Sequence, residues 1–158
     1  GTEASGTGNM KFMINGAVTF GTYDGANVEI KQCCGAEHFI QFGMETPEVN
    51  ALKAAGYSPK KYIAQSPILQ KVMTLLRNGI NGNYFNEIED NLTNSDPYMV
   101  MADFDSYHET QRMLRNLYQD KIKFGQMSLM NIANAGKFSA DRAIDDYAKT
   151  IWNLERID

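Results

Sequence analysis

Residues that begin and end helices constrain the fold of this 158-residue chain more than any other feature of its sequence. The clearest case starts at Ser66, a capping residue followed by Pro67, and stops at Gly79. Gly16 ends an earlier apolar stretch in the same way, since glycine is common just beyond a helix. Together with apolar residues at helical spacing, these signals predict helices over residues 7–15, 27–32, 46–56, 66–79, 104–118, 126–135 and 139–154.

Three short apolar stretches between these helices have the composition of buried strands. They are AVTFGT (residues 17–22), HFIQF (38–42) and the stretch 98–104, which contains MVMADF. Alternation of strands with helices predicts an α/β fold with a small parallel sheet, built from residues 1–44 and 98–104, and a helical tail over 105–158. So small a sheet has edges that need cover. We therefore expect one partial domain, residues 1–158, from the downstream part of a longer protein.

The last helix, over residues 139–154, has a strong apolar stripe. Its members recur at i, i+3, i+4, i+7 and i+8, which is typical of a face turned toward a core. The stripe is predicted to be buried and consists of Ile144, Tyr147, Ala148, Ile151 and Trp152.

Composition excludes several classes of protein. The net charge of −4 comes from acids and bases spread along the chain, whereas a nucleic-acid binder needs a clustered basic face. No apolar run approaches the roughly 20 residues that cross a bilayer, and no leader segment is recognisable. Neighbouring Cys33 and Cys34 are badly placed to bridge each other, and with His38 and His108 they show no metal-ligand spacing. We expect a cytoplasmic protein without a metal site.

The stretch EASGTGNMKF, residues 3–12, combines small residues with a single lysine. Small residues at the start of a helix allow an anion to approach the free backbone N–H groups, where the helix dipole is positive. Thr7 adds a hydroxyl donor. Thr7 and Lys11 are four residues apart, so they share one helix face, and the Lys11 amine leans back toward the anion.

This spacing matches neither common nucleotide motif. G-x-x-x-x-G-K-[ST] is not met, and the last position of G-x-G-x-x-G would fall on Lys11. A small phosphate ester whose other end reacts with lysine fits better, and pyridoxal phosphate carries both a phosphate and an aldehyde that can form a Schiff base. The alternative is a glycine-rich helix start with a solvated lysine. Asp24, which precedes Gly25, is interpreted as a structural turn residue.

Longer stretches carry a resemblance to a known family. EASGTGNMKFMINGAVTFGTYDGANVEI, then HFIQFG, MVMADF and NIANAGKFSADRAIDDYA, resemble segments of the α-glucan phosphorylases of glycogen, starch and maltodextrin, in the same order. The resemblance implies the C-terminal part of a Rossmann-like domain in a GT-B type glycosyltransferase fold. It implies phosphorolysis of α-1,4-glucans to glucose 1-phosphate with retained configuration. The phosphate of pyridoxal phosphate is then expected to act as a proton shuttle.

The resemblance also implies roles for individual residues. The residues expected to hold the cofactor, through a Schiff base and through backbone N–H groups to its phosphate, are Lys11, Gly6, Thr7 and Gly8. The residues expected to hold the glucose are Glu3, through its carboxylate, and the backbone of Ala4, Ser5 and Gly6. A carboxylate suits sugar hydroxyls because ionised acceptors form strong hydrogen bonds.

Several expectations concern the parent protein. The resemblance implies a longer homodimeric enzyme that binds α-1,4-glucan and inorganic phosphate, and whose other parts supply a histidine, an arginine and further lysines. We therefore expect the 158 residues alone to be inactive, because catalysis needs its groups held together closely. Two other readings stay open: a phosphate-ligand binding module without chemistry, and a structural unit that serves oligomer contacts.

Overall fold

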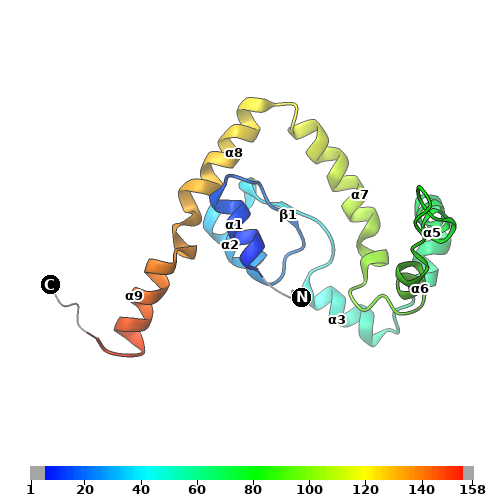
Figure 1. The fold of residues 1–158 in the computed structure, drawn as a ribbon, viewed down its shortest axis with the longest axis horizontal. Helices are drawn as coiled ribbons and strands as arrows, with labels where there is room; N and C mark the ends of the chain where they lie inside the picture. The colour runs from blue at the N-terminus through cyan, green and yellow to red at the C-terminus, as the bar shows by residue number, and fades with distance from the viewer. Residues whose placement is uncertain (1–5, 155–158) are drawn as a thin grey trace.

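The computed structural model describes residues 6–154, which form an α/β chain dominated by helices (Figure 1). α7 and α8 form an arch, α1, α2 and the strands lie beneath it, and α9 continues beyond α8 as an arm. None of the described helices is long and apolar enough to cross a membrane. The elements are α1 (Thr7–Ile14), β1 (Phe20–Gly21), α2 (Ala26–Cys34), the 3₁₀ helix η1 (Ala36–His38), β2 (Ile40–Gln41), α3 (Thr46–Ala54), α4 (Pro59–Gln65), α5 (Pro67–Asn78), α6 (Asn86–Asn94), α7 (Val100–Leu117), α8 (Lys121–Asn134), the 3₁₀ helix η2 (Ala135–Phe138) and α9 (Ala140–Thr150).

The sheet has two parallel strands joined through α2. Phe20 of β1 lies opposite Ile40 of β2. The Ile40 N–H donates to Thr19 O at 2.9 Å, and the Phe42 N–H donates to Gly21 O at 3.2 Å. Both strands were expected, and the α/β class is confirmed, but each strand is shorter than the stretches 17–22 and 38–42 because only these few residues pair.

The prediction of a third strand over residues 98–104 is wrong. α7 begins at Val100, and Asp96 accepts hydrogen bonds from the N–H groups of Val100 and Met101, both at 2.9 Å. Met101 and Phe104, three residues apart, then turn to the same side of the helix and pack against α5. A short apolar run suits a strand or a buried helix equally well by composition, and the Asp96 cap decides for the helix.

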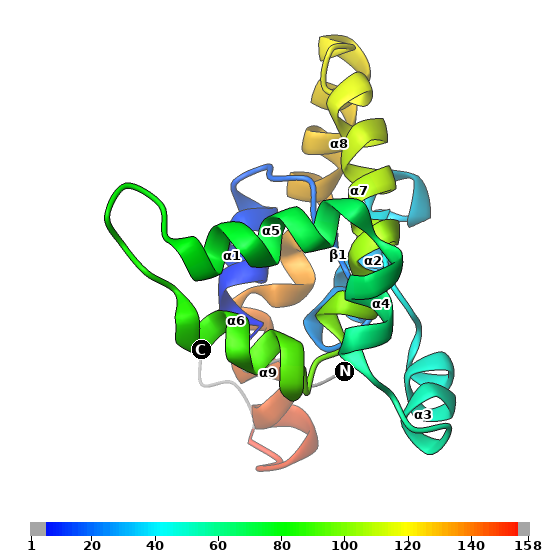
Figure 2. The same ribbon diagram turned by 90° about the vertical axis from the view of Figure 1, so that its right-hand side faces the viewer.

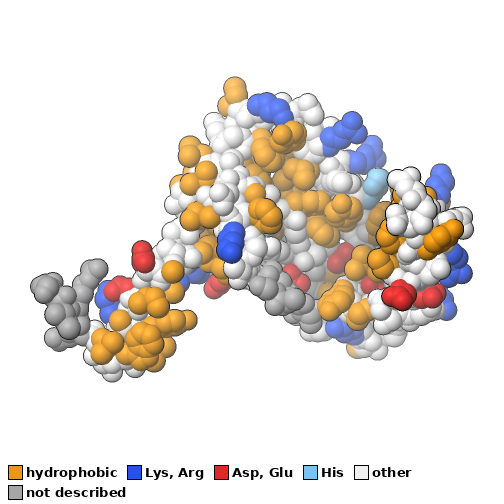
Figure 3. All heavy atoms as spheres, viewed as in Figure 1, with side chains coloured by type: hydrophobic (Ala, Val, Ile, Leu, Met, Phe, Trp, Pro, Cys, Tyr) orange, Lys and Arg blue, Asp and Glu red, His pale blue; other side chains and the backbone are white. Residues whose placement is uncertain are grey.

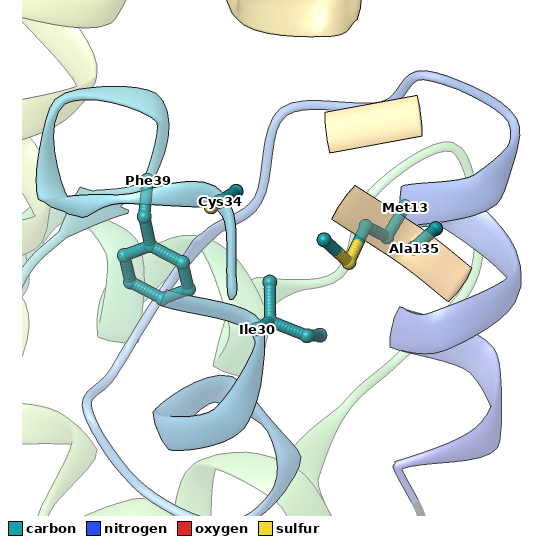
Figure 4. Close-up of a cluster of buried hydrophobic side chains, with 5 residues drawn as sticks. All are labelled: Met13, Ile30, Cys34, Phe39 and Ala135. Carbon is teal, nitrogen blue, oxygen red and sulfur yellow. The ribbon is translucent and has the colours of Figure 1, made fainter. Parts of the chain in front are cut away.

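Two separate clusters of buried side chains hold the fold together. The first joins α1, α2, η2 and the start of β2, and its members are Met13, Ile30, Cys34, Phe39 and Ala135 (Figure 4). The second joins α5 to α7 through Leu69, Met73 and Met101. α4, α5 and α6 contact one another around this second cluster, at the side of the molecule that faces the viewer in Figure 2.

The apolar stripe of α9 is exposed, contrary to the prediction that it is buried. Ile144 is 56% exposed, Ile151 63% and Trp152 54%. Hydrophobic side chains gather on the surface of the arm (Figure 3). The helix starts as expected, with Ser139 accepting from the N–H of Arg142. Helical spacing therefore identified the apolar face, but no described residue covers it.

Candidate functional site

The first turn of α1 presents backbone donors toward solvent. The Met10 N–H donates to Gly6 O at 3.1 Å, which is the first bond of the helix, so the N–H groups of Thr7 and Gly8 lie before the hydrogen-bonded ladder. Among residues 6–154 no side chain caps this helix, and its first turn contains no acidic residue. Unpaired donors and the positive end of a helix dipole together favour an anion.

The surroundings of this turn leave room for a ligand. Thr7 and Gly8 are both exposed, and a Cβ added at Gly8 would meet no described atom within 4 Å. Gly6, at the N-cap, is half-buried and has ordinary right-handed backbone angles. Within residues 6–154, the side of the turn at Gly8 is therefore unobstructed.

Lys11 is exposed and lies one turn after Thr7 on the same side of α1. No hydrogen bond or ion pair between described residues uses its amine. Met13, two residues later, is fully buried in the first cluster and fixes the opposite side of the helix. The part of the chain that the structure describes forms no enclosing pocket around this amine. The amine is, however, accessible to a ligand seated on the first turn.

A buried polar connection, which sequence reasoning missed, ties this turn to the sheet. Asn9 in the first turn of α1 donates from Nδ2 to Asn27 Oδ1 at 2.9 Å. Asn27, at the start of α2, donates from Nδ2 to Thr22 O at 3.0 Å. The Thr22 hydroxyl donates to Asp24 Oδ1 at 3.0 Å, so the turn interpretation of Asp24 is confirmed. An asparagine two residues after Asp24-Gly25 was the available sequence signal, since it places an amide in the first turn of a helix.

A cavity of about 620 Å³ lies beside Asn27 at the carboxyl ends of β1 and β2. Its apolar wall includes Phe20, Phe42 and Tyr107, whose ring centroids are 4.8 to 5.4 Å apart. Its polar wall includes Asp103, and burial raises the pKa of this carboxyl above its usual value. Ligands of α/β proteins commonly bind at the carboxyl ends of parallel strands.

Four of the predicted site residues come together on one helix: Gly6, Thr7, Gly8 and Lys11. The predicted sugar contacts of Glu3, Ala4 and Ser5 lie outside the described residues. Within residues 6–154, no group of three His, Cys, Asp or Glu side chains is placed to hold a metal ion. Both cysteines are free thiols, and burial raises the pKa of Cys34.

Comparison with known proteins gives a family to this arrangement. Residues 1–154 match the family model of carbohydrate phosphorylases. The chain belongs to the carbohydrate phosphorylase family. This phosphorylase segment is 44% identical over 161 residues to glycogen phosphorylase of Synechocystis sp. and 43% identical over 159 residues to the muscle form of human glycogen phosphorylase. It is 44% identical over 162 residues to the human liver form.

These alignments cover nearly the whole phosphorylase segment but only part of each relative. They take in 99%, 98% and 100% of the chain, respectively, and 19% of each relative. The chain thus spans about a fifth of the length of the curated relatives that it matches.

Proposed function

We propose that the protein containing this segment catalyses phosphorolysis of α-1,4-glucans to glucose 1-phosphate, using pyridoxal phosphate held by α1. The observation that carries the proposal is the first turn of α1, whose Thr7 and Gly8 N–H groups no side chain of residues 6–154 caps, with a lysine on the same helix side. The family match over residues 1–154 supports it, because relatives at 43–44% identity are named glycogen phosphorylases.

The residues present fit a phosphate ester that also bears an amine-reactive group. The N–H groups of Gly6, Thr7 and Gly8 would bind the phosphate, with the helix dipole favouring its charge. The Thr7 hydroxyl would donate to a further phosphate oxygen. Lys11 would hold the other end through its amine, which no described side chain engages.

Each part of α1 has a separate task in this proposal. When bound, the cofactor supplies a phosphate that can pass a proton to and from the substrate phosphate. The backbone donors of the first turn fix where that phosphate sits, which matters because proton transfer needs hydrogen-bond distances. Met13, buried among α2 and η2 residues, holds the helix itself in place.

The sugar side of the site belongs to the same proposal. The Glu3 carboxylate and the backbone of Ala4, Ser5 and Gly6 would contact the glucose next to the cofactor phosphate. A Rossmann-like domain of a GT-B type fold is proposed to surround this segment, and the two parallel strands joined through α2 are compatible with it. A cytoplasmic homodimer acting on glucan and inorganic phosphate completes the proposal.

Reductive trapping tests the cofactor assignment. The full-length protein that carries this segment is loaded with pyridoxal phosphate, reduced with borohydride and digested, and the pyridoxyl mass is sought on the peptide that contains Lys11. Lys11→Arg keeps the charge but cannot be trapped, so it is the matched control. The proposal expects the adduct on Lys11 and phosphate-dependent release of glucose 1-phosphate from glycogen. A stable adduct on another lysine contradicts it.

The exposure of Lys11 favours a second candidate, a module that binds phosphate ligands without covalent chemistry. The same N–H donors would hold inorganic phosphate, and the amine would act only as a charge. Two results together would favour this candidate: reversible binding of inorganic phosphate without competition from pyridoxal phosphate, and the absence of a pyridoxyl adduct.

A further inference from the structure

Asn27 forms a side-chain hydrogen bond between α1 and α2, and it does so from a buried position. Its side chain is 7% exposed, and both ends of its amide are used. Oδ1 accepts from Asn9 Nδ2 at 2.9 Å, and Nδ2 donates to Thr22 O at 3.0 Å. A single amide therefore joins α1 to the residue that follows β1.

The bond reaches α1 at the turn that carries the open N–H donors. Asn9 directly follows Gly8, whereas the apolar anchor of the helix, Met13, lies about 6 Å further along the axis at 1.5 Å per residue. Lys11 falls between these two anchors. With Met13 alone, an eight-residue helix is held at one end and its first turn is free to pivot. The Asn9–Asn27 bond removes that freedom.

The backbone of β1 is shaped to admit the Asn27 amide. A Cβ added at Gly21 would lie 2.7 Å from Asn27 Nδ2, closer than real Cβ contacts allow. Gly21 has no left-handed backbone angle, so space, rather than conformation, explains the glycine. A methyl group there would push the amide away from Thr22 O.

We propose that Asn27 is a positioning residue that holds the first turn of α1, through Asn9, in the orientation in which its N–H groups and Lys11 retain pyridoxal phosphate. This inference rests on the proposed function. It assigns Asn27 no contact with the cofactor: its action runs through Asn9 and the helix backbone.

Asn131 supplies a matched control. It is fully buried, and its Nδ2 donates to His38 O and to Met127 O, both at 3.0 Å, so it joins α8 to η1 in the same part of the fold. Neither of these hydrogen bonds reaches α1. Asn131→Ala therefore removes a comparable buried amide without releasing the first turn of α1.

The experiment uses the full-length holoenzyme and measures the rate at which pyridoxal phosphate is released into a scavenger. Asn27→Ala and Asn9→Ala are each expected to raise this rate about fivefold, the equivalent of ~1 kcal/mol for one hydrogen bond. Gly21→Ala is expected to act in the same direction. Asn131→Ala is expected to lower stability to unfolding while leaving the release rate within twofold.

A second readout needs no cofactor. In protein stripped of pyridoxal phosphate, Asn27→Ala and Asn9→Ala should speed hydrogen exchange of the Met10 amide, and Asn131→Ala should not. If Asn27→Ala does not fold, Asn9→Ala carries the test, since alanine is favourable within a helix. The double variant should release cofactor no faster than Asn27→Ala alone, because both changes break one connection.

The outcomes separate the two proposals. Equal release rates for wild type, Asn27→Ala and Asn9→Ala, with the cofactor on Lys11, overturn the positioning role alone. An equally large effect of Asn131→Ala also overturns it, because general destabilisation then explains the result. Absence of cofactor from Lys11 in the wild-type protein overturns the proposed function instead.

Discussion

Tyr57 donates a hydrogen bond from its hydroxyl to Asp96 Oδ2 at 2.5 Å, and so ties the turn before α4 to the start of α7. Asp96 is 1% exposed and also accepts from the Val100 and Met101 N–H groups. Burial, and then the bond to Asp96, raise the pKa of the Tyr57 hydroxyl far above its usual value. The Tyr57 hydroxyl is therefore held as a hydrogen-bond donor to Asp96.

Removing either partner should loosen the start of α7, but to different extents. Tyr57→Phe leaves Asp96 with two backbone donors and is expected to cost ~1 kcal/mol. Asp96→Ala removes the cap and leaves the Tyr57 hydroxyl without its acceptor, at a cost of about 2–3 kcal/mol. Hydrogen exchange of the Val100 and Met101 amides, with denaturant unfolding, measures both. A larger loss for Tyr57→Phe than for Asp96→Ala would contradict this account.

The Arg77–Glu89 pair should make stability depend on pH in the acid range. Glu89 accepts from Arg77 and, at 3.0 Å, from the Thr93 hydroxyl. The bond from Arg77 lowers the pKa of Glu89, while burial opposes it. Because the folded pKa lies below the unfolded value, the contribution is complete above about pH 4.5 and is lost as the pH falls through the folded pKa.

Glu89→Gln is the control for this dependence. The variant should be less stable at pH 7, and its unfolding free energy should fall less steeply than that of the wild type below about pH 4.5. Denaturant titrations from pH 7 to pH 3 compare the slopes. Parallel curves for the two proteins would show that another group carries the acid sensitivity.

Two glycines with the same backbone conformation should respond differently to alanine. Gly43 has φ +78° and Gly56 has φ +82°, but only at Gly43 would a Cβ meet the Asp103 carboxylate, at 2.8 Å. Gly56→Ala is expected to cost about 1 kcal/mol for the left-handed angle alone. Gly43→Ala should cost a further ~1–3 kcal/mol, because Asp103 must move and loses its bond from the Met44 N–H. Equal unfolding free energies for the two variants would refute the steric argument.

Trp152 is the single tryptophan of the chain and should report whether α9 is covered. It is 54% exposed, with its ring 5.9 Å from that of Tyr147. In the isolated 158-residue chain its fluorescence should be red-shifted and readily quenched by acrylamide. A blue-shifted, protected emission from a monodisperse monomer would mean that α9 folds back onto the chain.

The 158 residues alone are expected to release no glucose 1-phosphate from glycogen and inorganic phosphate. The chain spans 19% of the length of its relatives, and catalysis requires the reacting groups to be held within about an ångström. A coupled assay on the purified chain, with a full-length phosphorylase as positive control, measures this. Phosphate-dependent product above the heat-denatured blank would overturn the expectation.

The sequence predicted those parts of the fold whose causes are local. Ser66 caps α5, and Gly16 and Gly79 end helices with φ +80° and +84°. α3 begins at Thr46, where the helix predicted over residues 46–56 begins, and Glu45 before it forms a capping box with Glu48.

The failures concern interactions between distant parts of the chain. Met101 and Phe104 were assigned to a strand, but the Asp96 cap and the packing of the second cluster place them in α7. Trp152 was assigned to the core because spacing identifies an apolar face without identifying its partner. The helix on which the site is proposed, α1, was predictable for the same local reason that helix ends were. The Asn9–Asn27 connection was not, because it joins residues 18 positions apart.

The two clusters of buried side chains share no member among the described residues. This separates heat resistance around Leu69 from ligand binding on α1. A ligand seated on α1 stabilises the part that folds around Met13, and its binding energy does not reach Leu69 directly. On heating, α4 to α6 should melt at a temperature that does not depend on the cofactor concentration. The melting temperature of α1 should instead rise as the cofactor concentration is raised. Substitutions around Leu69 can therefore change heat resistance during evolution while the chemistry carried by α1 is left intact.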